Sequence, residues 1–206
     1  MNAGSLGCLK LCGSNVPTSK ELSNHNEACE QCQPLQGLSR KYSHTHELIN
    51  NLPYIAMIVL GTAIFVVGFD SLLWRWIAAS TYLIYGVTGV FWIIVFMCPF
   101  CRYYDTRSCP CGYGSIAARF RKKQPAHRFD EKFRQHIPVI VPLWFIPIVI
   151  GIPLAVSSFS MTLLALLVAF AVDSFVILPL VSTKHGCKDC PQRDSCPWMR
   201  RKAKQA

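Results

Sequence analysis

Eleven cysteines are the residues of this 206-residue chain best suited to chemistry. In chain order they are Cys8, Cys12, Cys29, Cys32, Cys98, Cys101, Cys109, Cys111, Cys187, Cys190 and Cys196. They occur in polar segments that contain glycine and proline, whereas a cysteine that only packs as a small hydrophobic side chain belongs on an apolar face. Cysteines clustered in this way are typical of metal sites or redox thiols.

The central segment carries four of these cysteines, with two, seven and one residues between them. They are Cys98, Cys101, Cys109 and Cys111. Four thiolates are a complete ligand set for one tetrahedral Zn²⁺ or for one [4Fe–4S] cluster. Gly112 and Gly114 follow, and glycine allows the backbone to turn closely around a site and direct N–H groups at sulfur. The spacing predicts one four-ligand metal site and leaves the identity of the metal open.

The C-terminal segment predicts a second site with the thiolate ligands Cys187, Cys190 and Cys196. Its fourth position is His185, an N-terminal cysteine or an open site. Cys29 and Cys32 form a Cys-x2-Cys pair that either completes this second site or forms its own with Cys8 and Cys12. We expect the cysteines to bind one or two [4Fe–4S] clusters, with Zn²⁺ as the alternative.

The elements that would position these cysteines are apolar. Hydrophobic residues make up 51% of the chain and charged residues 16%, against about 25% charged in an ordinary soluble domain. A helix that crosses about 30 Å of hydrocarbon needs about 20 residues. Three runs without charged residues or histidine are long enough, at 48–69, 76–101 and 137–172. The third run continues beyond Asp173 to Val181 and can hold two helices.

The sequence therefore predicts an all-α integral membrane protein with four transmembrane helices, at about 52–73, 76–97, 137–156 and 159–181. The second turn is expected at the polar break 156–160. The five predicted segments are an N-terminal cysteine-containing segment 1–51, a transmembrane hairpin 52–97, a cysteine-rich basic loop 98–136, a second hairpin 137–181 and a cysteine-rich basic tail 182–206. We expect the three non-membrane segments to fold as a small metal-bound cap, because metal ligation supplies folding energy.

The basic residues predict the orientation of this bundle. Of the 21 lysines and arginines, 20 fall in the three non-membrane segments and only Arg75 falls in a short turn. The positive-inside rule then places both termini and the loop in the cytoplasm and the helices in the cell membrane. Cytosolic thiols rarely form lasting disulfides. Because the same rule explains the net charge of +10, no nucleic-acid partner is expected.

The loop between the two hairpins predicts a helix on the membrane surface. Segment 115–136 is basic, and Phe129, Phe133 and Ile137 form an apolar stripe at a spacing of four. This pattern predicts a helix whose cations contact the anionic headgroups of the inner leaflet. Ser115 is expected to cap a helix that begins near Ile116.

One acidic residue falls within the predicted spans. Asp173 would lie about 12 Å from the inner end of the fourth helix, where an ionised group is costly unless it is neutral or paired. It is a candidate proton carrier or quinone-facing acid. The alternative is a protonated carboxyl group that ties two helices together, with the polar face of Thr81, Tyr85 and Thr88 on the second helix as its partner.

Prolines distinguish the third predicted helix, because each removes a backbone hydrogen bond. They are Pro138, Pro142, Pro147 and Pro153. They predict a static bend, with a cavity between helices as the alternative.

The function that best fits these features is electron transfer. The protein would be a membrane-bound iron–sulfur protein that links a cytosolic redox partner to a membrane acceptor such as a quinone, and if it belongs to an enzyme it would be a redox subunit of a membrane oxidoreductase. The first alternative is a zinc-stabilised membrane scaffold or assembly subunit that docks a cytosolic partner without catalysis. The second is a soft-metal transporter or sensor, which the spans disfavour because they contain no line of cysteine or methionine ligands.

Overall fold

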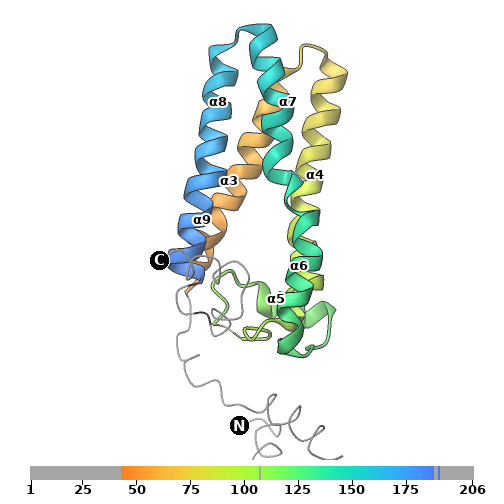
Figure 1. Ribbon diagram of the computed structural model, residues 1–206, viewed down its shortest axis with the longest axis vertical. Coiled ribbons are helices and arrows are strands. Elements are labelled where there is room, and N and C mark those ends of the chain that lie inside the picture. Colours follow the sequence, from red (N-terminus) through yellow and green to blue (C-terminus); the bar gives the residue numbers. More distant parts are fainter. Residues whose placement is uncertain (1–42, 107, 188–189, 191–206) are drawn as a thin grey trace, which may run out of the picture. The chain divides into compact units, whose positions relative to one another are not determined.

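The computed structural model describes residues 43–106, 108–187 and 190. All regular secondary structure in this part of the chain is helical, and it contains no strand (Figure 1). The long elements are α3 (His44–Gly68), α4 (Leu72–Phe96), α7 (Pro142–Ser158) and α8 (Met161–Val172). The last is continued by a π-helical turn η4 (Asp173–Ile177), by α9 (Leu178–Val181) and by a second π-helical turn η5 (Ser182–Gly186).

Four helical stretches are long and apolar enough to cross a membrane. They are His44–Gly68, Leu72–Phe100, Ala126–Ser158 and Met161–Gly186. The all-α prediction with four membrane-length helices is therefore confirmed, and the fold is compatible with a multi-pass membrane protein.

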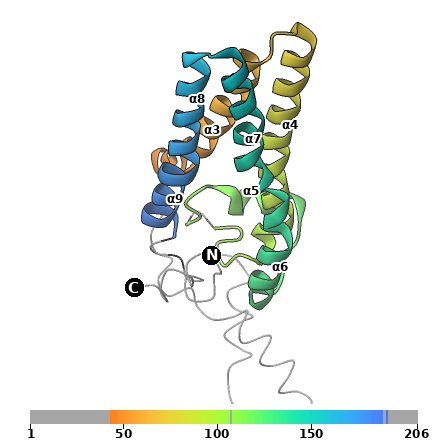
Figure 2. The ribbon, with the colours of Figure 1, turned by 45° about the horizontal axis from the view of Figure 1, so that its top comes forward.

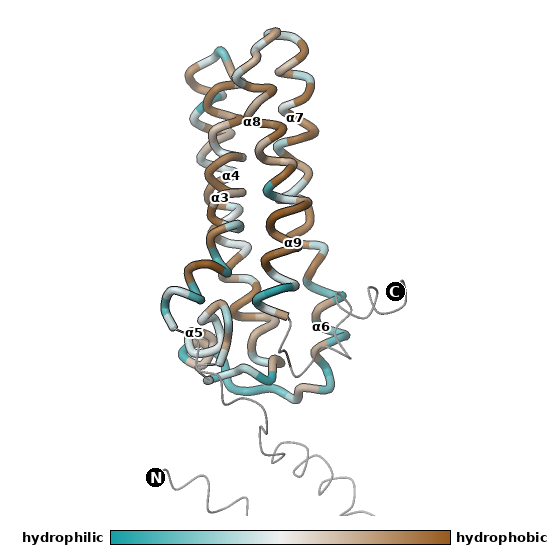
Figure 3. The backbone as a smooth tube through the Cα atoms, turned by 90° about the vertical axis from the view of Figure 1, so that its left-hand side faces the viewer, coloured by the Kyte–Doolittle hydropathy of each residue, from teal (hydrophilic) through white to brown (hydrophobic). Residues whose placement is uncertain are grey.

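Helix α3 is the central helix of the bundle and packs against α4, α7 and α8. Its core side chains Met57, Ile64 and Phe65 are almost fully buried. The rings of Phe65 and Tyr82 meet edge to face with their centroids 5.5 Å apart. Large apolar side chains on the outer faces are exposed, and Figure 3 shows hydrophobic colour along most of the four helices. An apolar outer surface of this extent is what a lipid environment stabilises.

Tyrosine hydroxyls join the helices to one another. Tyr82 on α4 donates to the carbonyl oxygen of Leu143 on α7 at 3.0 Å. Tyr54 on α3 donates to the carbonyl oxygen of Gly86 on α4 at 2.9 Å. A Cβ atom on Gly61 would lie 2.3 Å from the Tyr82 ring, so glycine is what lets this ring reach across α3 toward the second hairpin.

The first hairpin differs from its predicted boundaries. Helix α3 begins at His44 instead of near residue 52, and it ends at Gly68 instead of residue 73. Polar residues continue the helix beyond the apolar run, because a helix does not have to end where it leaves hydrocarbon. Arg75 is not in the turn but in the first turn of α4, where its Nε and Nη2 donate to the Phe69 carbonyl oxygen at 3.1 and 3.0 Å.

The second hairpin turns inside the predicted break. Phe159 has a left-handed backbone conformation with φ 46°, and the Ser160 side chain accepts a hydrogen bond from the Leu163 amide at 3.3 Å. This cap fixes the start of α8.

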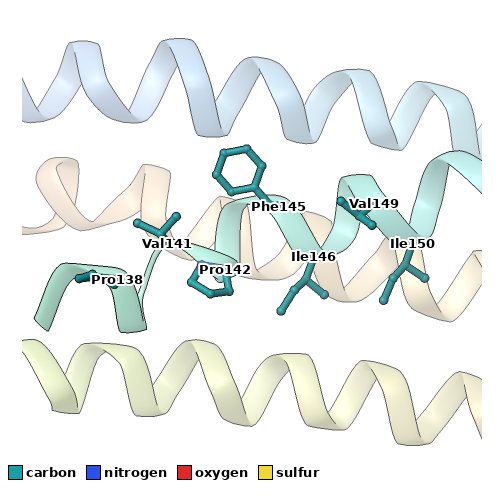
Figure 4. A pocket seen from close by; sticks show the side chains of 7 residues that line it. All are labelled: Pro138, Val141, Pro142, Phe145, Ile146, Val149 and Ile150. Carbon is teal, nitrogen blue, oxygen red and sulfur yellow. The ribbon is translucent and has the colours of Figure 1, made fainter.

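The prolines shape the start of α7. The chain before it forms a short 3₁₀ turn, η3 (Ile137–Val139), and α7 starts at Pro142 with Pro147 and Pro153 inside it. An open apolar groove of about 690 Å³ runs along this stretch. Its lining residues, drawn in Figure 4, are Pro138, Val141, Pro142, Phe145, Ile146, Val149 and Ile150. The prolines thus accompany both an interrupted helix and a groove on the surface of the bundle.

The loop between α4 and α7 contains two helices instead of one that begins near Ile116. They are α5 (Tyr113–Phe120) and α6 (Phe129–His136), and the short 3₁₀ turn η2 (Ala126–Arg128) precedes α6. Gly112 precedes α5, and the Ser115 hydroxyl donates to the Gly112 carbonyl oxygen at 3.0 Å instead of capping the helix N-terminus. Both helices lie at the end of the bundle where α3 begins and α9 ends (Figures 1 and 2). From this point the name cap is restricted to residues 98–125 of this loop.

Candidate metal centre

The first cysteine pair of the cap lies on one tight turn. The 3₁₀ helix η1 (Cys98–Phe100) follows α4 directly. The Cys101 amide donates to the Cys98 carbonyl oxygen at 3.1 Å, and the Tyr104 amide donates to the Cys101 carbonyl oxygen at 3.1 Å. A turn closed in this way keeps its ends within about 7 Å, measured between Cα atoms. The end of α4 therefore presents two thiols close together.

The second cysteine pair is held by glycine backbone geometry. Gly112 has φ +75°, and its amide donates to the Cys109 carbonyl oxygen at 3.1 Å. A Cβ atom on Gly114 would lie 2.3 Å from the Tyr103 carbonyl oxygen and 3.4 Å from the Cys109 Cβ. The close backbone approach expected from these two glycines is thus present, and it packs the second pair against the chain that follows Cys101.

Two asparagines of α3 anchor the cap to the bundle. The Asn50 Nδ2 donates to the Pro110 carbonyl oxygen at 3.1 Å, and the Asn51 Nδ2 donates to the Cys111 carbonyl oxygen at 3.1 Å. Sequence reasoning missed both residues. The only signal was a pair of adjacent amides at the edge of an apolar run, and nothing local links them to a loop about 60 residues away.

The four cap thiols share one electrostatic neighbourhood. Cys98 has Cys101, Cys109 and Cys111 as its electrostatic neighbours. Cys109 is 9% exposed. Burial raises the pKa of the Cys111 thiol to about 12, and the neighbouring Cys109, Cys187 and Glu47 act in the same direction.

Tyr113 lies beside the same thiols. Burial raises the pKa of its hydroxyl, with Cys111 as the largest of the contributing neighbours. The first residue of α5 therefore belongs to the same partly buried region as the thiols.

The gathered thiols do not form a closed ligand cage. Within the part of the chain that the structure describes, no group of three histidine, cysteine or acidic side chains is placed as ligands around one ion. Electrostatic interactions act over longer distances than metal bonds. In a tetrahedral zinc site with Zn–S bonds of about 2.3 Å, the sulfur atoms lie only about 3.8 Å from one another. The thiols are therefore electrostatic neighbours that are not placed as the ligands of one ion.

The tail brings two further thiols to this end of the bundle. The Cys190 amide donates to the Cys187 carbonyl oxygen at 3.3 Å. Cys187 is a charge neighbour of Cys111, whereas the His185 side chain is exposed. The six described cysteines are thiols and not disulfide partners. The other predicted ligands lie outside the described residues: Cys29, Cys32 and Cys196, with the alternatives Cys8 and Cys12.

Asp173 is buried in the bundle at the first position of the π-helical turn η4. It is 6% exposed and Ser174 is 1% exposed. The Asp173 Oδ2 and the Ser174 Oγ have no hydrogen-bond partner. A π-helical turn inside an α-helix frequently marks a functional position, and two adjacent buried polar groups without partners are costly unless a proton or a ligand compensates them.

The predicted partners of Asp173 on the second helix are wrong. The Tyr85 hydroxyl donates to the Val139 carbonyl oxygen, Thr88 is exposed, and Thr81 lines an open apolar groove on the outer face of α4. The physical reason is the order of the helices, because η4 packs on α3. The face of α4 that carries Thr81, Tyr85 and Thr88 therefore does not contact Asp173.

An aromatic cluster joins the cap, α4 and α6. The ring of Phe96 lies 4.3 Å from that of Trp92 and 5.1 Å from that of His136, measured between centroids. The Arg121 guanidinium carbon lies 5.6 Å from the centroid of the Phe96 ring. These contacts fix the end of α4 that leads into Cys98.

Comparisons with models of known families, with curated proteins and with solved structures gave no match. Function is therefore inferred from the chemistry of these residues alone.

Proposed function

We propose that this protein is a membrane-bound iron–sulfur electron-transfer protein that links a cytosolic redox partner to a membrane acceptor such as a quinone. The observation that supports this most is the pair of tight turns that carry Cys98 with Cys101 and Cys109 with Cys111, which pack together at the end of a membrane-length helix. Hydrophobic packing alone would not require four cysteines in one small region. Four is the number of cysteines that ligate one [4Fe–4S] cluster.

The four cap thiols and the backbone contacts around them support this proposal. Four cysteine thiolates ligate a [4Fe–4S] cluster, which supplies one-electron transfer when bound. Asn51 holds the backbone of Cys111, and Gly114 approaches Cys109 closely. Burial and fixed backbone dipoles around the sulfurs are the means by which a protein tunes such a site.

The charge distribution suggests how the protein sits in the cell membrane. The positive-inside rule places the cap, both termini and the basic residues of α5 and α6 on the cytoplasmic side, against the anionic inner leaflet. A cytosolic partner would then deliver electrons to the cap, and the acceptor would lie in the bilayer. Reducing a quinone to a quinol consumes two electrons and two protons. A one-electron cluster in the cap would therefore transfer an electron twice for each quinone.

Asp173 is our candidate for the proton carrier, because its buried carboxyl group has no hydrogen-bond partner at Oδ2. Asp173→Asn should leave the iron content unchanged and slow quinol formation by about a hundredfold, since general-acid groups contribute about that much. Ser174→Ala is the matched control. An unchanged rate in Asp173→Asn would assign the carboxyl group a structural role.

A zinc-stabilised scaffold or assembly subunit is the second candidate. The Cys-x2-Cys turn of Cys98 and Cys101 also has the ligand spacing typical of structural zinc sites. Zinc would fold the cap without moving electrons, and the cap would then only dock a cytosolic partner. The identity of the bound metal distinguishes the two functions.

The deciding experiment is anaerobic purification of the full chain in mild detergent, followed by assays of iron, acid-labile sulfide and zinc on one sample. We expect about four iron and four sulfide per occupied cluster, and loss of both in Cys98→Ser/Cys111→Ser. Ser115→Ala, in the same segment but without a thiol, should keep them. A colourless protein that contains zinc would replace electron transfer with the scaffold function.

A further inference from the structure

We propose that Cys98 and Cys101 form a redox-switch site, in which the two thiols close to a disulfide by exchange with a low-molecular-weight disulfide such as oxidised glutathione. The closed form would prevent both sulfurs from binding metal. The pairing of the two thiols stands on the geometry of one turn, and only its consequence for metal rests on the proposed function.

The helical type of this segment places the two side chains on one side. Residues 98–100 form the 3₁₀ helix η1, and the Cys101 amide closes it on the Cys98 carbonyl oxygen at 3.1 Å. In a 3₁₀ helix the side chains three residues apart are eclipsed, and a rise of about 2.0 Å per residue separates their Cα atoms by about 6 Å. Disulfides most often join Cα atoms about 5.5–6 Å apart. The turn therefore already has the backbone spacing of a disulfide.

Cys101 keeps this geometry although it ends the helix. Its φ is −79°, close to the range of about −50 to −70° found in 3₁₀ helices. Because rotation about the N–Cα bond sets the direction of Cβ relative to the preceding peptide, the Cys101 side chain leaves the backbone almost as it would in a helical residue. Its ψ of 142° changes only the course of the chain that follows.

The turn is also held by the chain around it. Pro99, whose ring fixes its φ, is less than 2% exposed. The Pro99 carbonyl oxygen accepts a hydrogen bond from the Gln124 amide at 2.9 Å, and the Phe100 amide donates to the Met97 carbonyl oxygen at 3.1 Å. Ordering of the backbone is a main entropic cost of bringing two groups together. Because this backbone is already ordered, closure of the disulfide needs little further ordering.

The other cysteine pair of the cap lacks this geometry and provides an internal comparison. The corresponding hydrogen bond there joins the Gly112 amide to the Cys109 carbonyl oxygen at 3.1 Å. The two ends of that turn are therefore Cys109 and Gly112, and Cys111 lies one position before the end. The structure thus selects the pair of Cys98 and Cys101 for disulfide closure.

Closure is a two-step exchange. Both thiols are partly exposed, so a small disulfide can reach them. One cysteine thiolate attacks a sulfur of oxidised glutathione, which breaks the glutathione S–S bond and releases one glutathione thiolate. The other cysteine thiolate then attacks the mixed disulfide, forms the S–S bond between Cys98 and Cys101 and releases the second glutathione. Two electrons pass from the cysteines to glutathione, and the two thiol protons go to the two leaving thiolates.

Closure would regulate metal binding by the cap. The metal ligand is the thiolate, so a closed pair removes two of the four predicted ligands. Excess reduced glutathione reverses the exchange and restores them. Cytosolic disulfides of this kind are usually transient and redox-sensing.

The first test uses the full chain in mild detergent, freed of metal by a chelator and equilibrated anaerobically with mixtures of reduced and oxidised glutathione. Remaining thiols are alkylated, and disulfides are mapped by mass spectrometry. We expect Cys98 and Cys101 to close in more reducing mixtures than Cys109 and Cys111. Wild-type chain that carries only mixed disulfides with glutathione, or that links Cys109 and Cys111 first, would overturn the switch.

Single variants test the order of the exchange. At least one of Cys98→Ser and Cys101→Ser should stop at the mixed disulfide and retain one glutathione on the remaining cysteine of the turn. Ser115→Ala, in the same segment but without a thiol, should close as the wild type does. Retention of glutathione by neither cysteine variant would overturn the exchange.

Zinc uptake separates the switch from the proposed function, because zinc can be added without a reductant. Zinc is offered to the closed chain and to the same chain after reduction and removal of the reductant. We expect uptake to be at least about tenfold weaker in the closed chain, as loss of metal-site groups produces, and equal uptake would overturn the regulation. Closure in a chain that binds no metal in either state would support the switch and overturn the proposed metal centre. Uptake by a chain that does not close would overturn the switch alone.

Discussion

The bundle and the cap are stabilised by different means. The bundle buries apolar side chains such as Phe65 and Phe170 and exposes others on its outer faces, so apolar packing stabilises its interior. The cap is held by specific backbone contacts, among them the Asn51 bond to Cys111 and the approach of Gly114 to Tyr103. The bundle should therefore tolerate many apolar exchanges, whereas the cap should depend on a few individual residues.

Gly114→Ala should have the largest effect and should damage only the cap. The new Cβ would lie 2.3 Å from a backbone oxygen, which cannot move aside as a side chain can, and such overpacking costs about 3 kcal/mol. We expect loss of most bound metal with unchanged helix content, measured by metal analysis and circular dichroism on one sample. Ser115→Ala is the control. Full metal binding in Gly114→Ala would show that the cap is as adaptable as the bundle.

Gly61→Ala is the corresponding change in the bundle. Its Cβ would lie 2.3 Å from the Tyr82 ring, whose hydroxyl is bonded to Leu143, so the ring has to shift at a cost of about 2 kcal/mol. Unfolding in mixed detergent micelles should occur at lower denaturant, while metal per folded chain stays constant. Thr62→Ala, whose hydroxyl bonds only within α3, should match the wild type. A fall in metal content for Gly61→Ala would mean that the two regions are not independent.

Asn51→Leu tests the connection between the two regions. It keeps the number of side-chain heavy atoms but removes the hydrogen bonds to the carbonyl oxygens of Cys111 and Glu47, and the loss of each such bond costs about 1 kcal/mol. We expect metal affinity to fall about tenfold in competition with a chelator, with little change in the stability of the bundle. Equal affinities for Asn51→Leu and wild type would rule out this anchor.

Arg75→Ala should have the smallest effect. The guanidinium group donates to the Phe69 carbonyl oxygen at the end of α3, and such contacts at a helix C-terminus contribute about 0.5 kcal/mol. A small loss of bundle stability with unchanged metal content is expected in the same detergent titration. A loss above about 2 kcal/mol would mean that this turn, and not apolar packing, governs the stability of the first hairpin.

Much of the bundle could be predicted from the sequence, because long uncharged runs identify membrane-length helices whatever their neighbours are. The ends of α3 could not, since its polar first turns lie outside the uncharged run and look like loop. The partner of Asp173 was also mispredicted, because periodicity gives the faces of a helix but not the order in which helices pack. Only the structure shows α3 between α4 and η4.

The candidate site was only partly predictable for a similar reason. Residue type and spacing identified the cap cysteines, and adjacent glycines indicated a tight backbone. The anchors Asn50 and Asn51 and the position of Gly186 beside Pro110 depend on contacts between distant segments. Neither has a local pattern, so residue spacing could not reveal them.

The most direct test of electron transfer uses the full chain in lipid nanodiscs, anaerobically, with absorption spectroscopy. Dithionite should bleach the visible band of an iron–sulfur centre, and a water-soluble quinone added after removal of dithionite should restore it while quinol forms, one quinol for every two electrons released. Cys98→Ser/Cys111→Ser should show neither change. A chain without a visible band, or a reduced band that quinone does not restore, would contradict electron transfer to a membrane quinone.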